Sequence, residues 1–322
     1  MISVCVTGAN TAIGERLIRS LLADTRVRHV LAVDHAPIER ALPFSGNRLT
    51  YKSVDLTKSR QVHELLFGPA RDLGVEVVMH LSQARSAHAV GSRVHARNVE
   101  ALRSILDLSG RHPTIRRVVV NSFGVVYKVG LDLPMLVTED HPLDLSPGAP
   151  QYVRDRVEAD LTACARMGLS DCEIVVLRCA EALGPGTGSQ LFDFLDAPVG
   201  FAPFGFDPMV NVATIADIVR ALELATHGSG EGVFNIPGFD TLPLSECARL
   251  WGTPLWGLPG PLIRRAYAIR HTLTGSEFSY GLNRKRMHFG LVLDGTRAKD
   301  LLGYVPNQPV DWPNGRRAHV VD

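Results

Sequence analysis

The chain has 322 residues, a length that suits about two domains. Hydrophobic residues make up 45% of it and charged residues 21%, which argues against a disordered, collagen-like or coiled-coil chain. The 34 Lys and Arg residues nearly balance the 33 Asp and Glu residues, so the formal net charge is +1 and no overall field attracts nucleic acid or an anionic membrane.

The first residues, Met1 to Gly8, form an apolar strand pattern without the basic stretch and long apolar run of a secretory signal. No apolar run approaches the roughly 18 residues of a membrane-spanning helix. The five cysteines are scattered, and the twelve histidines include no zinc-type spacing. We therefore expect a cytoplasmic protein with reduced cysteines and no metal site.

Apolar runs and helical patterns alternate in chain order. A strand at 2–6 precedes a helical pattern at 15–22, and a second strand at 30–33 ends in Asp34. Further apolar runs follow at 75–81, 118–120 and 174–177. Continuous apolar strands separated by helices predict an α/β fold with a doubly wound parallel sheet.

The first strand-to-helix turn contains Gly8 and Gly14, at the place where a pyrophosphate meets backbone N–H groups and the positive end of a helix. Asp34 lies 20 residues further on, where a carboxylate would bind ribose hydroxyls and disfavour a 2′-phosphate. The glycine turn together with Asp34 favours binding of NAD over NADP. The alternative interpretation is a strand-to-helix turn without a nucleotide, in which Asp34 is incidental. Thr11 replaces the middle glycine, so it either crowds the phosphates or donates its hydroxyl to one.

Composition changes after Gly184-Pro185-Gly186, and Pro, Gly and aromatic residues become dense at 198–208 and 251–261. We predict a dinucleotide-binding Rossmann domain at 1–180 and a smaller α+β substrate domain at 181–322. The helical pattern at 215–225 and the strand at 233–235 indicate that 210–237 returns to the main sheet, so that the two domains interleave.

Several motifs follow one another in a particular order. They are Thr7 to Gly14 (TGxxGxxG with its middle Gly replaced), Val54-Asp55-Leu56, His80 to Gln83, Asn98-Val99, Asn121 to Tyr127, Thr138 to Pro142, Tyr152 to Glu158, Leu177-Arg178, Gly184 to Gly186, Asp294 and Leu302 to Pro306. This order resembles the extended short-chain dehydrogenase/reductases, the NAD-dependent epimerase/dehydratase family typified by UDP-glucose 4-epimerase. The cofactor-binding residues implied by the turn and by this resemblance are Gly8, Asn10, Thr11, Ala12, Ile13, Gly14, Asp34, Asp55, Leu56, Leu81, Ser82, Gln83 and Asn98.

In the family that the chain resembles, a tyrosine is the general acid or base, a lysine four residues later lowers its pKa and holds the nicotinamide ribose, and a Ser or Thr binds the substrate oxygen. Here Tyr152 is followed by Arg156, which is permanently charged but bulkier and planar. The Ser or Thr position holds Phe123. Ser122 precedes it and replaces it only if the strand end is irregular, because neighbouring strand residues face opposite sides.

Two hypotheses follow. One is an NAD-dependent epimerase/dehydratase or oxidoreductase acting on a hydroxyl or carbonyl group of a nucleotide-sugar-like small molecule, with Tyr152, Arg156 and Ser122 as catalytic residues. The other is a non-catalytic dinucleotide-binding sensor or scaffold, because Thr11, Phe123 and Arg156 all depart from the pattern at functional positions. A homodimer is a further expectation from the resemblance, and the sequence leaves open whether the protein is an enzyme.

Residues 261–290 carry six basic side chains and one acid, Glu277, and part of this segment has the spacing of a basic amphipathic helix. It is a surface helix, a phosphate clamp formed by Arg264 and Arg265, or an anionic-membrane contact aided by Trp251 and Trp256. Glu139 has two interpretations. The structural one is a local cap, and the functional one is a contact with the substrate.

Overall fold

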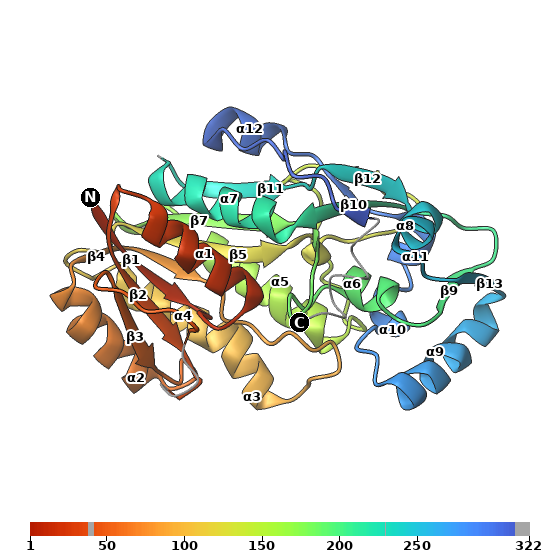
Figure 1. Ribbon diagram of the computed structural model, residues 1–322, viewed down its shortest axis with the longest axis horizontal. Coiled ribbons are helices and arrows are strands. Elements are labelled where there is room, and N and C mark those ends of the chain that lie inside the picture. Colours follow the sequence, from red (N-terminus) through yellow and green to blue (C-terminus); the bar gives the residue numbers. More distant parts are fainter. Residues whose placement is uncertain (38–41, 229, 313–322) are drawn as a thin grey trace.

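The computed structural model describes residues 1–37, 42–228 and 230–312, and its centre is a seven-stranded sheet in which every pairing is parallel (Figure 1). The strand order is β11-β7-β5-β4-β1-β2-β3. The strands are β1 (Ile2–Thr7), β2 (Val27–Asp34), β3 (Leu49–Ser53), β4 (Val75–His80), β5 (Arg117–Phe123), β7 (Glu173–Cys179) and β11 (Gly232–Ile236). The predicted doubly wound α/β sheet is therefore confirmed.

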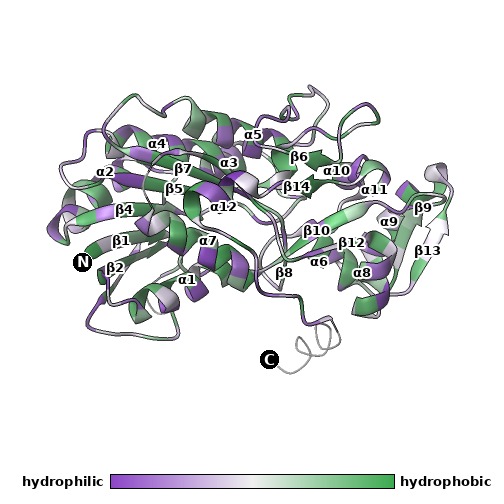
Figure 2. Ribbon diagram, turned by 90° about the horizontal axis from the view of Figure 1, so that it is seen from above, coloured by the Kyte–Doolittle hydropathy of each residue, from purple (hydrophilic) through white to green (hydrophobic). Residues whose placement is uncertain are grey.

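Helices cover both faces of this sheet because its strands are apolar on both sides. Val4 and Val6 of β1 pack with α1 (Ala12–Ala23) and α7 (Ile215–His227), whereas Cys5 packs with the helices of the opposite face. The helical segments on that other side are α2 (Ser59–Leu65), η2 (Leu66–Ala70), α3 (Ser92–His95), η3 (Ala96–Glu100), α4 (Ala101–Ser109) and α5 (Gln151–Cys164). Figure 2 shows the apolar strands of the sheet between these layers.

Helix α12 (Thr296–Leu302) packs against β11 and α7 of the main sheet, whereas most of the remaining elements build a smaller unit at the other end of the molecule (Figure 1). Its sheets have the orders β12-β10-β8, β13-β9 and β14-β6. The strands are β6 (Leu136–Val137), β8 (Glu181–Leu183), β9 (Gly200–Pro203), β10 (Met209–Thr214), β12 (Asp240–Pro243), β13 (Leu255–Leu258) and β14 (Val292–Leu293). The further helical segments are η4 (Gly124–Val126), α6 (Gln190–Leu195), α8 (Leu244–Trp251), α9 (Gly260–Thr274), α10 (Tyr280–Asn283) and α11 (Arg286–Phe289).

The chain crosses between the two units more than once. β10 belongs to the sheet of the smaller unit, but α7 follows it onto the main sheet and β11 pairs with β7 there. The smaller unit has its own core, with Phe194, Trp251 and Tyr267 among its buried side chains. Among the described residues, no helix is both long enough and apolar enough to cross a membrane.

Candidate functional site

The turn between β1 and α1 is packed so closely that two of its positions exclude a side chain. Gly8 has φ +71°, and a Cβ on it would lie 2.9 Å from the carbonyl carbon of Leu81. A Cβ on Gly14 would lie 2.2 Å from the carbonyl oxygen of Gly8. Both contacts are with backbone atoms, which cannot move aside as a flexible side chain can, so glycine is required at both positions.

Thr11 is the N-cap of α1 and uses its hydroxyl entirely within the turn. Its Oγ1 accepts a hydrogen bond from the Gly14 amide at 3.0 Å and donates to the Gly8 carbonyl at 2.8 Å. An N-cap of this kind stabilises a helix by about 1 kcal/mol. The hydroxyl proton is therefore engaged, and Thr11 does not offer it to a phosphate in this conformation.

Asp34 ends β2 beside this turn. Its carboxylate accepts hydrogen bonds from the amides of Asn10, at 3.1 Å, and His35, at 2.7 Å. Asp55 and Leu56 border the open cavity of about 730 Å³ that lies nearby and that His35 also lines. The Asp55 carboxylate accepts from the hydroxyl of Thr57, and this bond holds the pKa of Asp55 below its usual value. These residues suit the adenosine half of a dinucleotide.

A hydrogen bond to the helical segment η3, supported by α5, holds the loop after β4 in place. Buried Asn98 accepts from the Ala84 amide at 2.8 Å and donates to Asp155 at 3.1 Å. Asn98 therefore positions this loop. Gln83 donates to the Asn121 carbonyl at 2.9 Å, and its buried Oε1 has no hydrogen-bond partner among the described residues.

Tyr152 and Arg156 come together one helical turn apart on α5. The guanidinium carbon of Arg156 lies 3.4 Å from the centre of the Tyr152 ring and 4.9 Å from that of Phe123. Arg156 also donates to the carbonyls of Tyr152 and Ala84. The Tyr152 hydroxyl donates to the Gly188 carbonyl at 3.1 Å.

Burial controls the protonation of this pair. It raises the pKa of Tyr152, and the positive charge of Arg156 opposes the shift without cancelling it. Burial lowers the pKa of Arg156, and its Nε has no hydrogen-bond partner among the described residues. The phenol therefore keeps its proton at neutral pH and holds it against a backbone carbonyl.

Ser122 does not reach this site, contrary to its assignment as a catalytic residue. Its hydroxyl donates to the Asp160 carboxylate at 2.7 Å, and Asp160 forms a buried ion pair with Arg178. The pairing of β5 with β7 continues without a bulge through Phe123, so Ser122 and Phe123 face opposite sides of the sheet. The regular strand end keeps the aromatic side chain in the site and the hydroxyl out of it.

The inner part of the groove is nearly filled. Phe123, Arg156 and Gln83 line a cavity of about 20 Å³, which has room for about one water molecule. Arg85 also lines this cavity and donates to the Gly186 carbonyl at 2.8 Å. An apolar cavity that holds one six-membered ring measures about 150 Å³. The described residues therefore fit the adenosine half of NAD, and this inner cavity by itself leaves no room for the nicotinamide ring.

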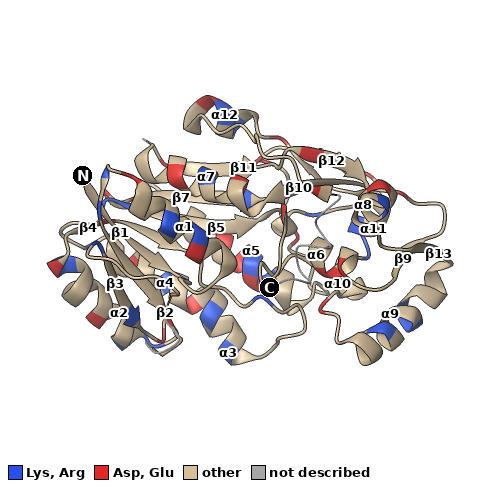
Figure 3. Cartoon of the chain, viewed as in Figure 1, with Lys and Arg blue, Asp and Glu red and all other residues tan. Residues whose placement is uncertain are grey.

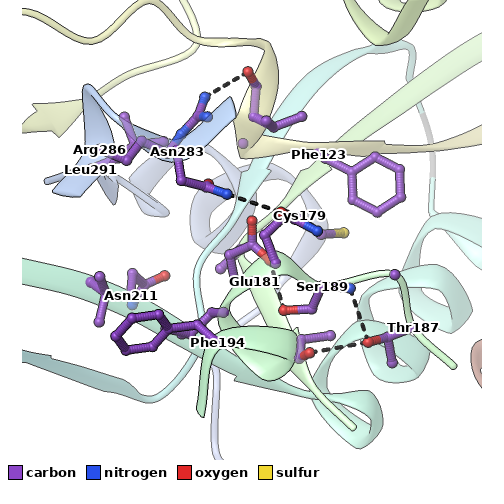
Figure 4. Close-up of a pocket in the computed structure, with 18 of the residues that line it drawn as sticks. Phe123, Cys179, Glu181, Thr187, Ser189, Phe194, Asn211, Asn283, Arg286 and Leu291 are labelled. Carbon is purple, nitrogen blue, oxygen red and sulfur yellow. Dashed lines mark hydrogen bonds between the residues drawn. The ribbon is translucent and has the colours of Figure 1, made fainter. Parts of the chain in front are cut away.

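A second cavity, which Tyr152 also lines, lies between the main sheet and the smaller unit. Figure 4 shows the side chains around it. Glu181 of β8 and Arg286 of α11 line it together with Phe123. Sequence reasoning missed the roles of both charged residues. Arg286 stands in the basic segment 261–290, but only the fold shows that Arg286 lines this cavity, whereas Arg270 of the same segment is buried in the smaller unit.

The other residues considered for substrate contact lie elsewhere. Arg264 and Arg265 are exposed on α9, which carries no acidic residue (Figure 3), and neither lines these cavities. The Glu139 carboxylate accepts from the Asn235 amide at 2.7 Å and so joins the loop to β11. Trp251 is buried in the smaller unit, which is incompatible with the surface contact considered for it, whereas Trp256 is exposed.

Comparisons with known proteins agree with this architecture. The solved structure of a UDP-glucose 4-epimerase with UDP-glucose from Thermotoga maritima has a TM-score of 0.72 at 16% identity, covering 98% of this chain and 96% of that one. A dTDP-glucose 4,6-dehydratase from Bacillus anthracis in complex with NAD also has a TM-score of 0.72, at 15% identity, with 99% and 96% covered. At these identities the likeness shows the fold alone.

Sequence comparison extends further. An uncharacterized protein of Mycobacterium bovis is 28% identical over 311 residues, which cover 94% of this chain and 80% of that protein. The model of the NAD dependent epimerase/dehydratase family matches residues 4–195, more than half of the chain. The match spans the glycine turn, Asp34 and the helix of Tyr152, and the chain belongs to the NAD dependent epimerase/dehydratase family.

Proposed function

We propose that this protein binds NAD at the turn between β1 and α1 and acts as a sensor or scaffold without transferring hydride. The observation that carries the proposal is the position of Arg156 between the rings of Tyr152 and Phe123. That arrangement occupies the inner groove, and the Tyr152 hydroxyl donates to the Gly188 carbonyl.

Binding of NAD is supported by the adenosine end of the groove. Gly8 and Gly14 bring the backbone close to the place of a pyrophosphate, and the Asp34 carboxylate stands where ribose hydroxyls would lie. The negative charge of Asp34 disfavours a 2′-phosphate, so NAD is preferred to NADP. The family to which the chain belongs and the NAD complex of the Bacillus anthracis neighbour support the same ligand. NAD supplies hydride chemistry when it is bound, but Phe123, Arg156 and Gln83 leave only about 20 Å³ open in the inner groove.

A thermal-shift titration with NAD, NADP and ADP-ribose tests binding, because a ligand at 100 times its Kd stabilises a protein by about 2.7 kcal/mol. We expect NAD and ADP-ribose to give similar shifts and NADP a smaller one. Asp34→Asn should reduce the NAD shift and narrow the difference from NADP, while exposed Asp132→Asn, the matched control, should leave both unchanged. The absence of any shift with NAD would contradict the proposal.

The second candidate is an active epimerase, dehydratase or oxidoreductase that acts on a nucleotide-linked sugar. It is favoured by one observation: Arg286 places a positive charge in the cavity beside Tyr152. Turnover of UDP-glucose or dTDP-glucose, with a change in nicotinamide absorbance that Tyr152→Phe abolishes, would establish this activity. We expect no turnover with either compound.

A further inference from the structure

The cavity beside Tyr152 is lined mainly by apolar side chains. They come from both units and include Phe123, Val125, Leu191, Phe194 and Leu293. The volume of the cavity is about 100 Å³, of the same order as the apolar cavity of about 150 Å³ that holds one benzene molecule. Space and surface therefore suit a compact apolar body.

The hydroxyl groups around the cavity are already engaged within the protein. Thr187 donates to the Gly184 carbonyl at 2.8 Å. Ser189 donates to the Glu181 carboxylate at 2.7 Å and accepts from the Phe192 amide as the N-cap of α6. Figure 4 shows Glu181 and Ser189 turned toward each other. These groups serve to hold the loop before α6.

The two asparagine side chains of the cavity are used in the same way. Asn211 accepts from the Gly238 amide at 2.9 Å and donates to the Gly238 carbonyl at 3.1 Å. Asn283 donates to the Gln190 side chain at 3.0 Å. A sugar hydroxyl that entered here would lose its hydrogen bonds to water and find few replacements, which is unfavourable.

Arg286 is different from these polar residues. Its Nη2 donates to the carbonyls of Val125, at 2.7 Å, and Tyr127, at 3.4 Å, and it forms no ion pair with any described residue. Burial lowers its pKa, so the charged form is held at a cost. Glu181 contributes a negative charge nearby, but its carboxylate bonds to Ser189. The cavity therefore offers one guanidinium without a bonded counter-ion.

We propose that this cavity binds a small monocarboxylate with a compact apolar body, its carboxylate on Arg286 and its apolar body against Phe123 and Phe194. A guanidinium matches the planar carboxylate with two parallel N–H donors. Phe123 occupies the position at which the family has a Ser or Thr that binds the substrate oxygen. Its ring supplies apolar contact area to such a ligand instead. The inference rests on the proposed function in treating this cavity as a binding site and not as a site of hydride transfer.

Isothermal titration calorimetry at pH 7 tests the inference with butanoate and 3-methylbutanoate, with butanol and 3-methylbutanamide as neutral counterparts, and with UDP-glucose. We expect the carboxylates to bind at least tenfold more tightly than the neutral compounds, and UDP-glucose not to bind. Arg286→Gln should remove that preference, whereas Arg284→Gln, two residues earlier and exposed, should retain it. Arg286→Lys keeps the charge and should retain part of it.

Each variant is also titrated with NAD by thermal shift, which reports folding and the other ligand site separately. Carboxylate binding that persists without an NAD shift would contradict the proposed function and leave this inference standing. Equal affinity for carboxylates and neutral compounds, no binding of either, or binding of UDP-glucose that depends on Arg286 would overturn the inference.

Discussion

The guanidinium carbon of Arg156 lies over the ring of Tyr152, 3.4 Å from the ring centre. Residues four apart on a helix lie on the same side, and here the contact continues to Phe123 on β5. A guanidinium stacks on aromatic rings in a way that an ammonium on a flexible stem does not. The Arg156 side chain therefore acts by packing against Tyr152, and the Tyr152 phenol stays protonated.

Replacing the arginine should destabilise the protein. Arg156→Lys removes the planar stack and at least one of the two hydrogen bonds to the carbonyls of Tyr152 and Ala84. We expect a loss of about 1–3 kcal/mol in the free energy of unfolding, measured by urea denaturation. Arg154→Lys, on the same helix but exposed, should change it by less than about 0.5 kcal/mol. Equal effects of the two variants would show that stacking of Arg156 on Tyr152 does not contribute to the free energy of unfolding.

Tyr152 and Tyr127, both buried, should differ in their sensitivity to loss of the hydroxyl. Tyr152→Phe breaks one hydrogen bond, to Gly188, and should cost about 0.5–1.5 kcal/mol without changing the NAD shift. Tyr127→Phe breaks bonds with both Asn235 and the charged Arg178, so we expect about 1.5–3 kcal/mol. Urea denaturation of both variants provides the comparison, and a larger loss for Tyr152→Phe would contradict it.

A single methyl group in the glycine turn should impair both folding and NAD binding. Gly14→Ala puts a Cβ 2.2 Å from the Gly8 carbonyl oxygen, so the backbone has to shift, at a cost of about 1–3 kcal/mol. Gly46→Ala is the control, because nothing lies within 4 Å of its added Cβ. Urea denaturation and the thermal shift with NAD measure the two effects. An unchanged NAD shift in Gly14→Ala would place the nucleotide elsewhere.

Asp193 should make the stability depend on pH between about 4 and 7. Burial, followed by the negative charges of Glu181 and Glu277, raises the pKa of Asp193 from 3.8 to about 7. The folded state then holds this proton more tightly than the unfolded chain, so the contribution of Asp193 to stability falls as pH rises from about 4 to 7 and is constant above.

The variant Asp193→Asn removes this pH dependence. We expect it to be more stable than the wild type at pH 8, by a margin that shrinks toward pH 4, as measured by urea midpoints across that range. Asp132→Asn, at an exposed loop position, should show no such trend. A margin for Asp193→Asn that does not change with pH would contradict the prediction.

The local parts of the nucleotide site are determined by the sequence alone. Gly8, Gly14 and Asp34 belong to one strand-turn-helix-strand segment, so their spacing along the chain determines their spacing in the molecule. The same holds for Tyr152 and Arg156, which one helical turn brings together. The parallel sheet also followed from the alternation of apolar runs and helices, and the fold confirms it.

Tertiary structure decided which side chains face the cavities. The sequence placed Phe123 at the site and allowed Ser122 to replace it only at an irregular strand end. The regular pairing of β5 with β7 decides this, because it turns the phenyl ring inward and the hydroxyl toward Asp160. Arg286 likewise could not be chosen over Arg264 from composition. Both are arginines in one basic segment. Both α9 and α11 pack against β9, and the position of each arginine on its packed helix determines which guanidinium lines a cavity and which faces solvent. Contacts between residues far apart in the chain carry no local signal, because they depend on how whole elements pack.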